Sequence, residues 1–532
     1  MTAPPAQEGL EPQPARPAGG LGRSTAIFAV WTGVSRVAGL AREILAAAIF
    51  GTQGAINAFV IAFQVPNLLR SLVADSALSA AFLPVFTELE EQGRARDARR
   101  LAGALIGLIS MVLGLLTLVA IVTAPWVMPL FAPGLPDELV DETVRLAQIM
   151  FPIVVLLGLT GIVAALLQAH GEFGATAFAP VLWNMVIIAG LAVATPMVPE
   201  DDRITVYAVA ILVGTLAQLL YLLPSLRGKG PFPISLGLGN RRVRQVLWLM
   251  LPVTLGLGLI NVNLSVDSVF ATLVSDDSPR AIDAAFRLYL LPQGVFSVAI
   301  ATVLFPTISR LAARRDVAGM QGTLAQGLRQ IFFMLLPASA FLLVMSEPVV
   351  RLVFQRGEFD AASTSLTSDA LFYFAIGLAF NGASLLVIRA FFSMQRPWLP
   401  TAVAGLGVVL NGVLNAILYQ PLGTGGIPLA TSISSIVTFL VLQWLLEREL
   451  GGLHRAWLLD GLARSVVASA VSALLAWSTW RVLDDVLGRG AIAQVVSVGA
   501  AIAAGALAYL SAAQAFEMPE LRALSRLTRP LR

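Results

Sequence analysis

The first apolar run of the chain contains the stretch SRVAGLARE at residues 35–43, which places Arg36 and Arg42 inside a segment long enough to cross a bilayer. The second run contains VPNLLRSL at residues 65–72 and adds Arg70. A guanidinium stays protonated in proteins, so each of these side chains must face water, a counter-charge or an anionic ligand. Turning one toward lipid at mid-bilayer costs roughly 3 kcal/mol on insertion scales. The two runs therefore predict membrane-spanning helices around a positively charged cavity, and phosphate suits the planar donor fork best.

The composition fixes the class of protein. With 57% hydrophobic and 13% charged residues among 532, and a mean hydropathy of +0.81, the chain has the composition of a polytopic helical membrane protein. It has no cysteine, which excludes disulfides, thiolate metal sites and a cysteine nucleophile. Residues 1–22 are rich in Pro, Ala, Gly and Glu and lack an apolar run, so we expect a disordered cytoplasmic tail and not a signal peptide.

Apolar stretches follow one another from Thr25 onward, and each is long enough to span roughly 30 Å of hydrocarbon. We therefore expect an all-α fold with about fourteen transmembrane helices. The second and eighth stretches are longer than one span and contain prolines, which predicts kinks or extensions beyond the bilayer. The expected spans lie near residues 25–49, 55–86, 101–125, 144–169, 176–196, 205–224, 245–274, 281–309, 325–346, 366–392, 399–420, 426–446, 462–481 and 491–513.

The loop charges are distributed unequally between the two sides of these spans. Assigning Lys and Arg to alternate sides, with the N-terminus inside, gives 23 inside and 7 outside, and five arginines fall within spans. Cytoplasmic loops of membrane proteins carry such an excess of positive charge. An even number of spans then predicts that both termini lie in the cytoplasm.

A weak internal repeat divides the chain. The second span closes with AFLPVFTEL at residues 81–89, and the eighth closes with VLFPTISRL at residues 303–311. Equivalent signatures six spans apart predict two parallel six-helix lobes around a central site, as in many transporters. The predicted division is an N-lobe at 23–240, a C-lobe at 241–450, two further helices within 451–515 and a basic cytoplasmic tail at 516–532.

Several motifs of the chain resemble those of one family. They are the run from Ser35 to Phe82, AFAP at residues 177–180, FQRGEF at residues 354–359, and FFS at residues 391–393 followed by Pro397. Together they resemble the MurJ (MviN) family of lipid II flippases, within the MOP exporter superfamily, over roughly residues 24–515. The resemblance implies fourteen helices in two lobes around a central cavity. It also implies a multi-pass protein of the cytoplasmic membrane that moves lipid II, a lipid-linked disaccharide-pentapeptide, to the outer leaflet by alternating access for peptidoglycan synthesis.

The same resemblance implies roles for the arginines. Arg42, Arg70 and Arg287 match family arginines at the cavity, and Arg36 and Ser35 belong to the same motif. Forked cations that converge from both lobes can hold a pyrophosphate bidentately. The expected substrate-binding set is Arg36, Arg42, Arg70, Arg287, Ser35 and Asn57.

Two reservations accompany this set. The arginines can instead pair with Glu43, Asp75 or helix-end carbonyls and fix the packing of the lobes. The chain also departs from the family, which often has an acidic residue at Asn57, a basic one at Gln64 and an acidic one at Leu290. These lost charges leave the arginine cluster less compensated and permit an altered ion coupling or another lipid-linked substrate.

A second group of polar residues lies within later spans. Asp267 lies deep in the seventh expected span, Asn411 and Asn415 share one face of the eleventh, and Thr431 lies early in the twelfth. All four offer hard oxygen ligands, so Na⁺ or H⁺ suits them better than a transition metal. The alternative is ordinary hydrogen bonding between helices. No other cofactor is expected.

The sequence lacks a catalytic constellation. It contains no Ser/His/Asp order with a supporting elbow, no HExxH and no Walker loop, so we expect a transporter and not an enzyme. The expected partners are lipid II, membrane lipids and wall-synthesis proteins, and no nucleic acid. Two alternatives remain: a flippase or exporter of another polyprenyl-linked glycan, and a non-transporting scaffold of wall synthesis.

Overall fold

The computed structural model describes residues 18–73, 76–237 and 239–521, with their side chains except at 18–29, 70–81, 249, 251–253, 255–257 and 260. These residues form helices and connecting loops, and no strand occurs among them. The all-α class predicted from the sequence is confirmed.

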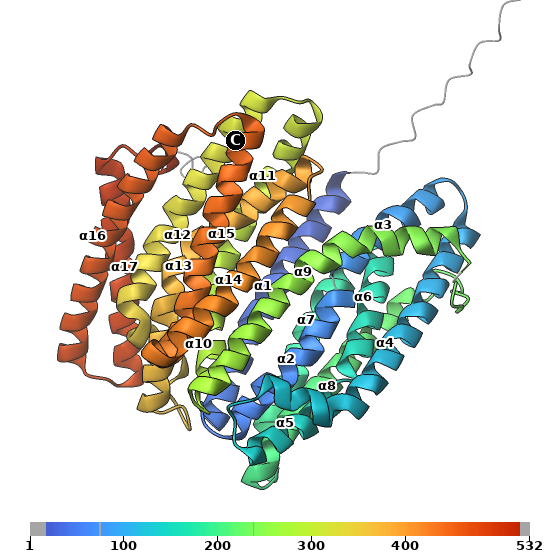
Figure 1. The fold of residues 1–532 in the computed structure, drawn as a ribbon, viewed down its shortest axis with the longest axis horizontal. Coiled ribbons are helices and arrows are strands. Elements are labelled where there is room, and N and C mark those ends of the chain that lie inside the picture. Colours follow the sequence, from blue (N-terminus) through green and yellow to red (C-terminus); the bar gives the residue numbers. More distant parts are fainter. Residues whose placement is uncertain (1–17, 74–75, 238, 522–532) are drawn as a thin grey trace, which may run out of the picture.

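The described part of the chain contains seventeen α-helices. Figure 1 shows how they are arranged. Two π-helical turns interrupt them, Gly190–Ala194 after α7 and Gln293–Ser297 between α10 and α11. The helices are α1 Ala18–Phe50, α2 Ala55–Val73, α3 Ser76–Glu91, α4 Ala95–Phe131, α5 Asp137–Met150, α6 Ile153–Ala169, α7 Phe173–Ala189, α8 Arg203–Leu222, α9 Arg241–Val274, α10 Ser278–Pro292, α11 Val298–Ala313, α12 Val317–Phe354, α13 Ala361–Ser393, α14 Trp398–Leu422, α15 Gly426–Leu450, α16 Arg455–Leu487 and α17 Ala491–Ala515.

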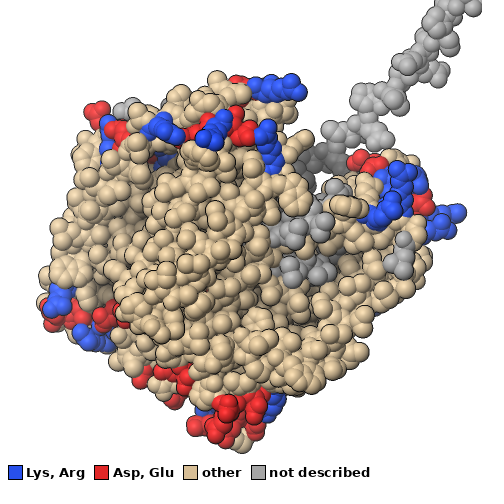
Figure 2. All heavy atoms as spheres, viewed as in Figure 1, with Lys and Arg blue, Asp and Glu red and all other residues tan. Residues whose placement is uncertain are grey.

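The surface has the pattern of a membrane protein. Within the described ranges, ten helical segments are long and apolar enough to cross a bilayer by length and composition. Figure 2 shows charged side chains gathered at two opposite ends of the molecule, with a broad uncharged belt between them. The chain is therefore a multi-pass membrane protein, whereas the count of fourteen spans stays a prediction.

The helices form two groups beside each other in Figure 1. The first group contains α2 to α8, and α1 packs on its α7; the second group contains α10 to α15. Helix α9 lies between the groups and packs on α14 as well as on α2 and α3. We call the end at which α1 begins the upper side and the other end the lower side, as they lie in Figure 1. The lobe boundaries given by the sequence stay a prediction.

The two C-terminal helices are attached to the second group through α12. Near its upper end, α12 carries Arg329, which pairs with Glu520 beyond α17. Its guanidinium also donates to the Trp457 carbonyl at 3.1 Å and lies 4.0 Å from the centre of that indole ring. The charge count assigned Arg329, near the start of the expected span 325–346, to the cytoplasmic side, and the structure buries its side chain.

A second attachment of the same kind lies near the lower end of α12. Arg351 donates to Asp484 of α16 at 2.8 Å and lies 5.7 Å from the Trp480 ring. The sequence placed Arg351 in an outer loop, yet it is buried too. Residues 329 and 351 are separated by about 33 Å along an α-helix, which is close to the hydrocarbon thickness of a bilayer. We name these two contacts the hairpin clamps, because they hold the α16–α17 hairpin at both ends.

The two groups of helices touch at the lower side through short loops. The backbone N–H of Glu358, between α12 and α13, donates to the carbonyl of Ala48 near the end of α1 at 2.9 Å. The Thr52 hydroxyl donates to the Ser363 hydroxyl, also at 2.9 Å. We name this contact the lower seal, because it joins the two groups of helices at this side.

Glycines make the lower seal possible. Gly51 and Gly357 both have positive φ, at +61° and +59°. A Cβ added to Gly357 would lie 2.1 Å from the Ala48 carbonyl oxygen, and one added to Gly51 would lie 2.5 Å from the Glu358 carbonyl oxygen. Real Cβ atoms do not approach backbone so closely, so the two loops meet only because both positions lack a side chain.

We expect Gly357→Ala to open the lower seal, whereas Gly171→Ala should leave it closed. Both glycines have positive φ, so alanine costs about 1–2 kcal/mol of backbone strain at either position. Only Gly357 also faces backbone atoms, since a Cβ on Gly171 meets nothing within 4 Å. The measurement is disulfide formation between Thr52→Cys and Ser363→Cys in the cysteine-free chain. An equal yield in both alanine variants would contradict the close approach of these loops.

Candidate functional site

A cavity of about 600 Å³ lies between the two groups of helices. Its wall includes residues of α1, α2, α6, α7 and α8 from the first group, and of α9, α10 and α13. Among the described residues, five with charged side chains line it: Arg42, Glu43, Asp267, Asp283 and Arg287. The cavity is thus built where the groups face each other, as the sequence predicts for a transport site.

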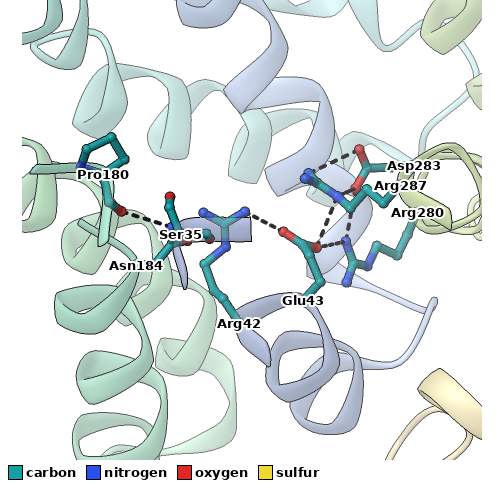
Figure 3. A network of polar contacts seen from close by, with 8 residues as sticks. All are labelled: Ser35, Arg42, Glu43, Pro180, Asn184, Arg280, Asp283 and Arg287. Carbon is teal, nitrogen blue, oxygen red and sulfur yellow. Dashed lines mark hydrogen bonds and ion pairs between the residues drawn. The ribbon is translucent and has the colours of Figure 1, made fainter. Parts of the chain in front are cut away.

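A network of charges joins α1 to α10 beside this cavity (Figure 3). The Arg42 guanidinium donates to Glu43 Oε1 at 2.7 Å. The other oxygen of Glu43 lies 3.3 Å from Arg280 Nη1 and 3.1 Å from Arg287 Nε. Asp283 lies 3.0 Å from both of these nitrogens. Three guanidiniums therefore share two carboxylates, which leaves one positive charge in excess among these five residues.

Local helix geometry positions the α10 members of the network. Residues 280, 283 and 287 follow one another at i, i+3 and i+7, so their side chains emerge on one face of the helix. On α1, Arg42 and Glu43 are neighbours in sequence, and both are buried. Glu43 therefore reaches across to α10, while Arg42 extends along the cavity wall toward α7.

Arg42 keeps unused hydrogen-bonding capacity. Its guanidinium lies 4.6 Å from the centre of the Trp183 ring, a favourable cation–π contact. Its Nε and Nη1 atoms are buried and have no hydrogen-bond partner in the part of the chain that the structure describes, and the same holds for Nε and Nη2 of Arg280. Buried donors without acceptors are costly, more so when they are charged. The site is therefore able to accept an anion at these nitrogens.

The structure distributes the other predicted residues around this network. Ser35 lines the cavity, and its carbonyl accepts from Asn184 Nδ2 at 3.5 Å. Arg36 is exposed, and its guanidinium lies beside Gly294, where an added Cβ would be 3.2 Å from Nη1. Arg70 belongs to α2, but its side chain lies outside the described residues.

Asn57 does not occupy the predicted cavity position. Its side chain is fully buried, donates to the Thr52 carbonyl at 2.7 Å and accepts from the backbone N–H of Arg280 at 2.8 Å. The first N–H groups of a helix lack partners within the helix, and Asn57 satisfies one of those at the start of α10. The geometry therefore gives Asn57 a structural contact between the groups instead of a substrate contact.

The residues at the other family departures take up different positions. Gln64 donates to the Leu264 carbonyl at 2.9 Å, which links α2 to α9. Leu290 lines the cavity. The alternative pairing with Glu43 is what the structure shows for Arg42 and Arg287, whereas Asp75 lies outside the described residues.

The second predicted constellation comes together at the cavity wall. Asp267 Oδ1 accepts from Asn411 Nδ2 and Asn415 Nδ2, each at 2.8 Å, and its Oδ2 accepts from the Thr431 hydroxyl at 2.9 Å. Both asparagine oxygens are buried and have no hydrogen-bond partner in the described ranges. Turning each amide over would point its oxygen toward Asp267, and a hard cation between them would then meet only oxygen ligands.

Three members of the site escaped the sequence analysis: Arg280, Asp283 and Trp183. Arg280 was assigned to an outer loop because the eighth apolar stretch begins after it, yet only 2% of its surface is exposed. Asp283 lies three residues after Arg280 and four residues before Arg287. These spacings are typical of ion pairs on a helix, so they could have revealed Asp283 from the sequence. Nothing local indicates that Trp183 lies against Arg42.

The amino-acid sequence is similar to a known protein family and to individual proteins. The family model described as "Lipid II flippase MurJ" matches residues 46–488. A protein of Burkholderia cenocepacia named "Lipid II flippase MurJ" is 32% identical over 425 residues, covering 77% of this chain and 81% of that one. A protein of Rhizobium meliloti named "Probable lipid II flippase MurJ" is 32% identical over 450 residues, covering 82% and 83%.

Solved structures share the fold. A structure titled "Lipid II flippase MurJ, inward closed conformation" superimposes with a TM-score of 0.76 at 23% identity, over 92% of this chain and 98% of that one. An inward-facing multidrug resistance MATE transporter of the MOP superfamily gives a TM-score of 0.67 at 15% identity, over 79% and 96%. At these identities the likeness concerns the arrangement of helices.

We expect Arg280→Met to lower the stability of the protein far more than Arg94→Met. Arg280 is buried and paired with Glu43 and Asp283, and removing one partner of a buried ion pair costs about 3–5 kcal/mol, here because both carboxylates lose a charged donor. Arg94 pairs with Asp97 on the surface, where the loss is about 0–1 kcal/mol. The measurement is the thermal unfolding midpoint of the purified protein. Equal midpoints for the two variants would show that the network does not stabilise this conformation.

Proposed function

The chain belongs to the lipid II flippase MurJ family, and on that basis we propose that it moves lipid II from the inner to the outer leaflet of the cytoplasmic membrane. The match over most of the chain carries this conclusion, and the arginine network beside the cavity, in which three guanidiniums share two carboxylates, agrees with it. Another polyprenyl-linked substrate is not favoured, because the matched family and relatives are named for lipid II. The chain acts as a transporter in peptidoglycan synthesis and needs no catalytic residues for that task.

The pyrophosphate of lipid II is the group that the charged network suits. Arg42 has two unpartnered nitrogens, and Arg287 is held only half-buried at the cavity wall. Together they present the forked donors that bind phosphate oxygens bidentately. Glu43 and Asp283 hold these arginines in the absence of an anion, so a pyrophosphate competes with the carboxylates for the same donors.

This competition links substrate binding to the movement of the two groups. Glu43 on α1 holds Arg280 and Arg287 on α10, close to the Asn57 contact and the lower seal. A pyrophosphate that takes Arg42 and Arg287 weakens the hold of Glu43 on α10, and the lower side then opens more readily. Binding can shift the equilibrium only by the difference in affinity for the two states, and this exchange of ion pairs supplies such a difference.

We propose the orientation that the loop charges indicate. The 23 positive loop residues assigned to one side, against 7 on the other, support an orientation with the upper side and both termini in the cytoplasm. The cavity then receives lipid II from the inner leaflet, and the lower seal separates it from the outer side. The proposed partners besides lipid II are membrane lipids and wall-synthesis proteins.

We also propose that Asp267, Asn411, Asn415 and Thr431 bind the coupling cation, Na⁺ or H⁺. The support is their convergence at one carboxylate and the two buried amide oxygens without partners. Asp267 also lines the cavity that holds Arg42. Ion and substrate are thus close enough for each to affect the affinity of the other.

Single substitutions at the cavity arginines should abolish flipping while the protein still inserts. Loss of a charge-assisted, bidentate contact costs about 1.5–3 kcal/mol, which corresponds to roughly ten- to a hundredfold in rate or affinity. We expect this loss in Arg42→Ala and Arg287→Ala, and only partial recovery with lysine, which lacks the fork. The assay is lipid II translocation in proteoliposomes, with Arg94→Ala as the control. Near-normal flipping by both lysine variants would exclude bidentate pyrophosphate binding, and normal flipping by both alanine variants would favour the scaffold.

Asp267→Asn should remove the dependence of transport on the ion gradient. The substitution deletes the only formal charge of the proposed cation site, and with it most of the attraction for a hard cation. Asp276→Asn, in the loop after α9, is the control because it neutralises a carboxylate outside the site. The measurement is lipid II flipping with imposed sodium and proton gradients of either direction. A gradient response in Asp267→Asn as large as in the parent would leave these residues a packing role only.

A further inference from the structure

Arg389 is a cation inside a span, and the charges around it differ from those around the cavity arginines. It lies on α13, one turn before the upper end of that helix. Its Nη1 donates to the Thr302 hydroxyl at 3.0 Å, and its guanidinium carbon lies 5.7 Å from the centre of the Phe305 ring. Among the described residues no carboxylate forms an ion pair with it, whereas Arg42 pairs with one and Arg287 with two.

The contacts of Arg389 leave most of its donors free. A guanidinium has five N–H donors, and the threonine takes one of them. An arginine in a membrane span faces water, a counter-charge or an anion, because exposure to lipid is costly. Since Thr302 and Phe305 are both neutral, the charge of Arg389 stays available to an anionic ligand that approaches between α11 and α13.

Arg389 extends a series of cations along the run from α10 to α11. Arg287 lies on α10 within the network, and Arg36 lies beside Gly294 in the π-helical turn. Thr302, which holds Arg389, lies further up on α11. At 1.5 Å per residue, Gly294 is about 10 Å above Arg287 and Thr302 is about 12 Å above Gly294. The three cations therefore lie at successive heights between the upper side and Arg287 at the cavity wall.

The position of Arg389 is fixed by contacts below it on the same helix. Asn381 of α13 accepts from Gln293 of the π-helical turn at 2.6 Å and donates to Ser435 of α15 at 3.2 Å. Residue 389 is about two turns above residue 381. These hydrogen bonds hold α13 against the α10–α11 run, and the contact with Thr302 shows that Arg389 faces α11.

We propose that Arg389 is a further anion-binding residue, which makes the first contact with the pyrophosphate of lipid II on its way from the upper side to Arg36, Arg42 and Arg287. This inference rests on the proposed function and adds a residue to the path of the substrate. A charge at the rim of a binding site acts mainly on the rate of association and on its salt dependence, and less on the bound state. Arg389 therefore raises the rate at which the protein captures lipid II, and the cavity arginines hold the pyrophosphate once it is bound.

The test compares Arg389→Gln, Arg389→Lys and Arg356→Gln in the full-length protein. Arg356 is the matched control, because it is an exposed arginine that donates to a neutral oxygen, the Leu352 carbonyl, near the lower end of α12. Lipid II flipping is measured at several lipid II concentrations, at about 0.05 M and about 0.3 M salt, since ionic strength screens exposed charges. Binding of inorganic pyrophosphate to the purified variants gives a second readout that does not depend on transport.

For Arg389→Gln we expect a three- to tenfold higher half-saturating lipid II concentration, an unchanged maximal rate, a weaker salt dependence and weaker pyrophosphate binding. Lysine should keep most of the parent behaviour, because a rim contact needs charge more than a fork, and Arg356→Gln should match the parent. A lower maximal rate with unchanged half-saturation and pyrophosphate binding would overturn the proposal in favour of packing.

The experiment separates the two levels of inference through Arg42→Ala. If Arg42→Ala abolishes flipping and Arg389→Gln matches the parent in half-saturation, salt dependence and pyrophosphate binding, Arg389 has no part in capture and the proposed function stands. If Arg42→Ala flips lipid II normally, the proposed pyrophosphate site at the cavity is wrong. The proposal that Arg389 delivers the substrate to that site is then wrong as well.

Discussion

An arginine cannot shed its charge in the low dielectric of a membrane, and the arrangement of this protein follows from that constraint. Every buried arginine on α10 and α12 named above has a carboxylate beside it. These pairs join segments far apart in the sequence: Glu43 links α1 to α10, and Glu520 links the end of the chain to α12. These ion pairs therefore determine which helices pack against each other at these points.

The same constraint separates structural arginines from functional ones. Arg329 and Arg351 pair with a carboxylate and lie against a tryptophan ring, away from the central cavity. The cavity network differs, because its three guanidiniums share two carboxylates. An arginine that has its own carboxylate holds helices together, whereas a guanidinium in excess of the carboxylates leaves a positive charge for an anion.

The sequence predicts what depends on local pattern. Hydropathy predicts a helical membrane protein. Because a charged side chain within a membrane span is costly, Arg42 and Arg287 can be recognised as candidate site residues. The hard oxygens near Asp267 can be grouped because each lies deep in an apolar stretch. The burial of Arg280 and the backbone contacts of Asn57 depend instead on which helix ends meet. Apolar runs do not carry that information, so a residue just outside a run is assigned to a loop even when a neighbouring helix covers it.

The hairpin clamps have a mechanical consequence. A hydrophobic segment that does not match the thickness of its bilayer usually relieves the mismatch by tilting. The α16–α17 hairpin is fixed to α12 at two points about 33 Å apart, so it cannot tilt alone. Any mismatch that the hairpin meets is passed to the whole second group of helices, whose tilt relative to the first group sets the width of the cavity. The thickness of the surrounding membrane thereby affects the equilibrium between the states of the protein that differ in the width of the cavity.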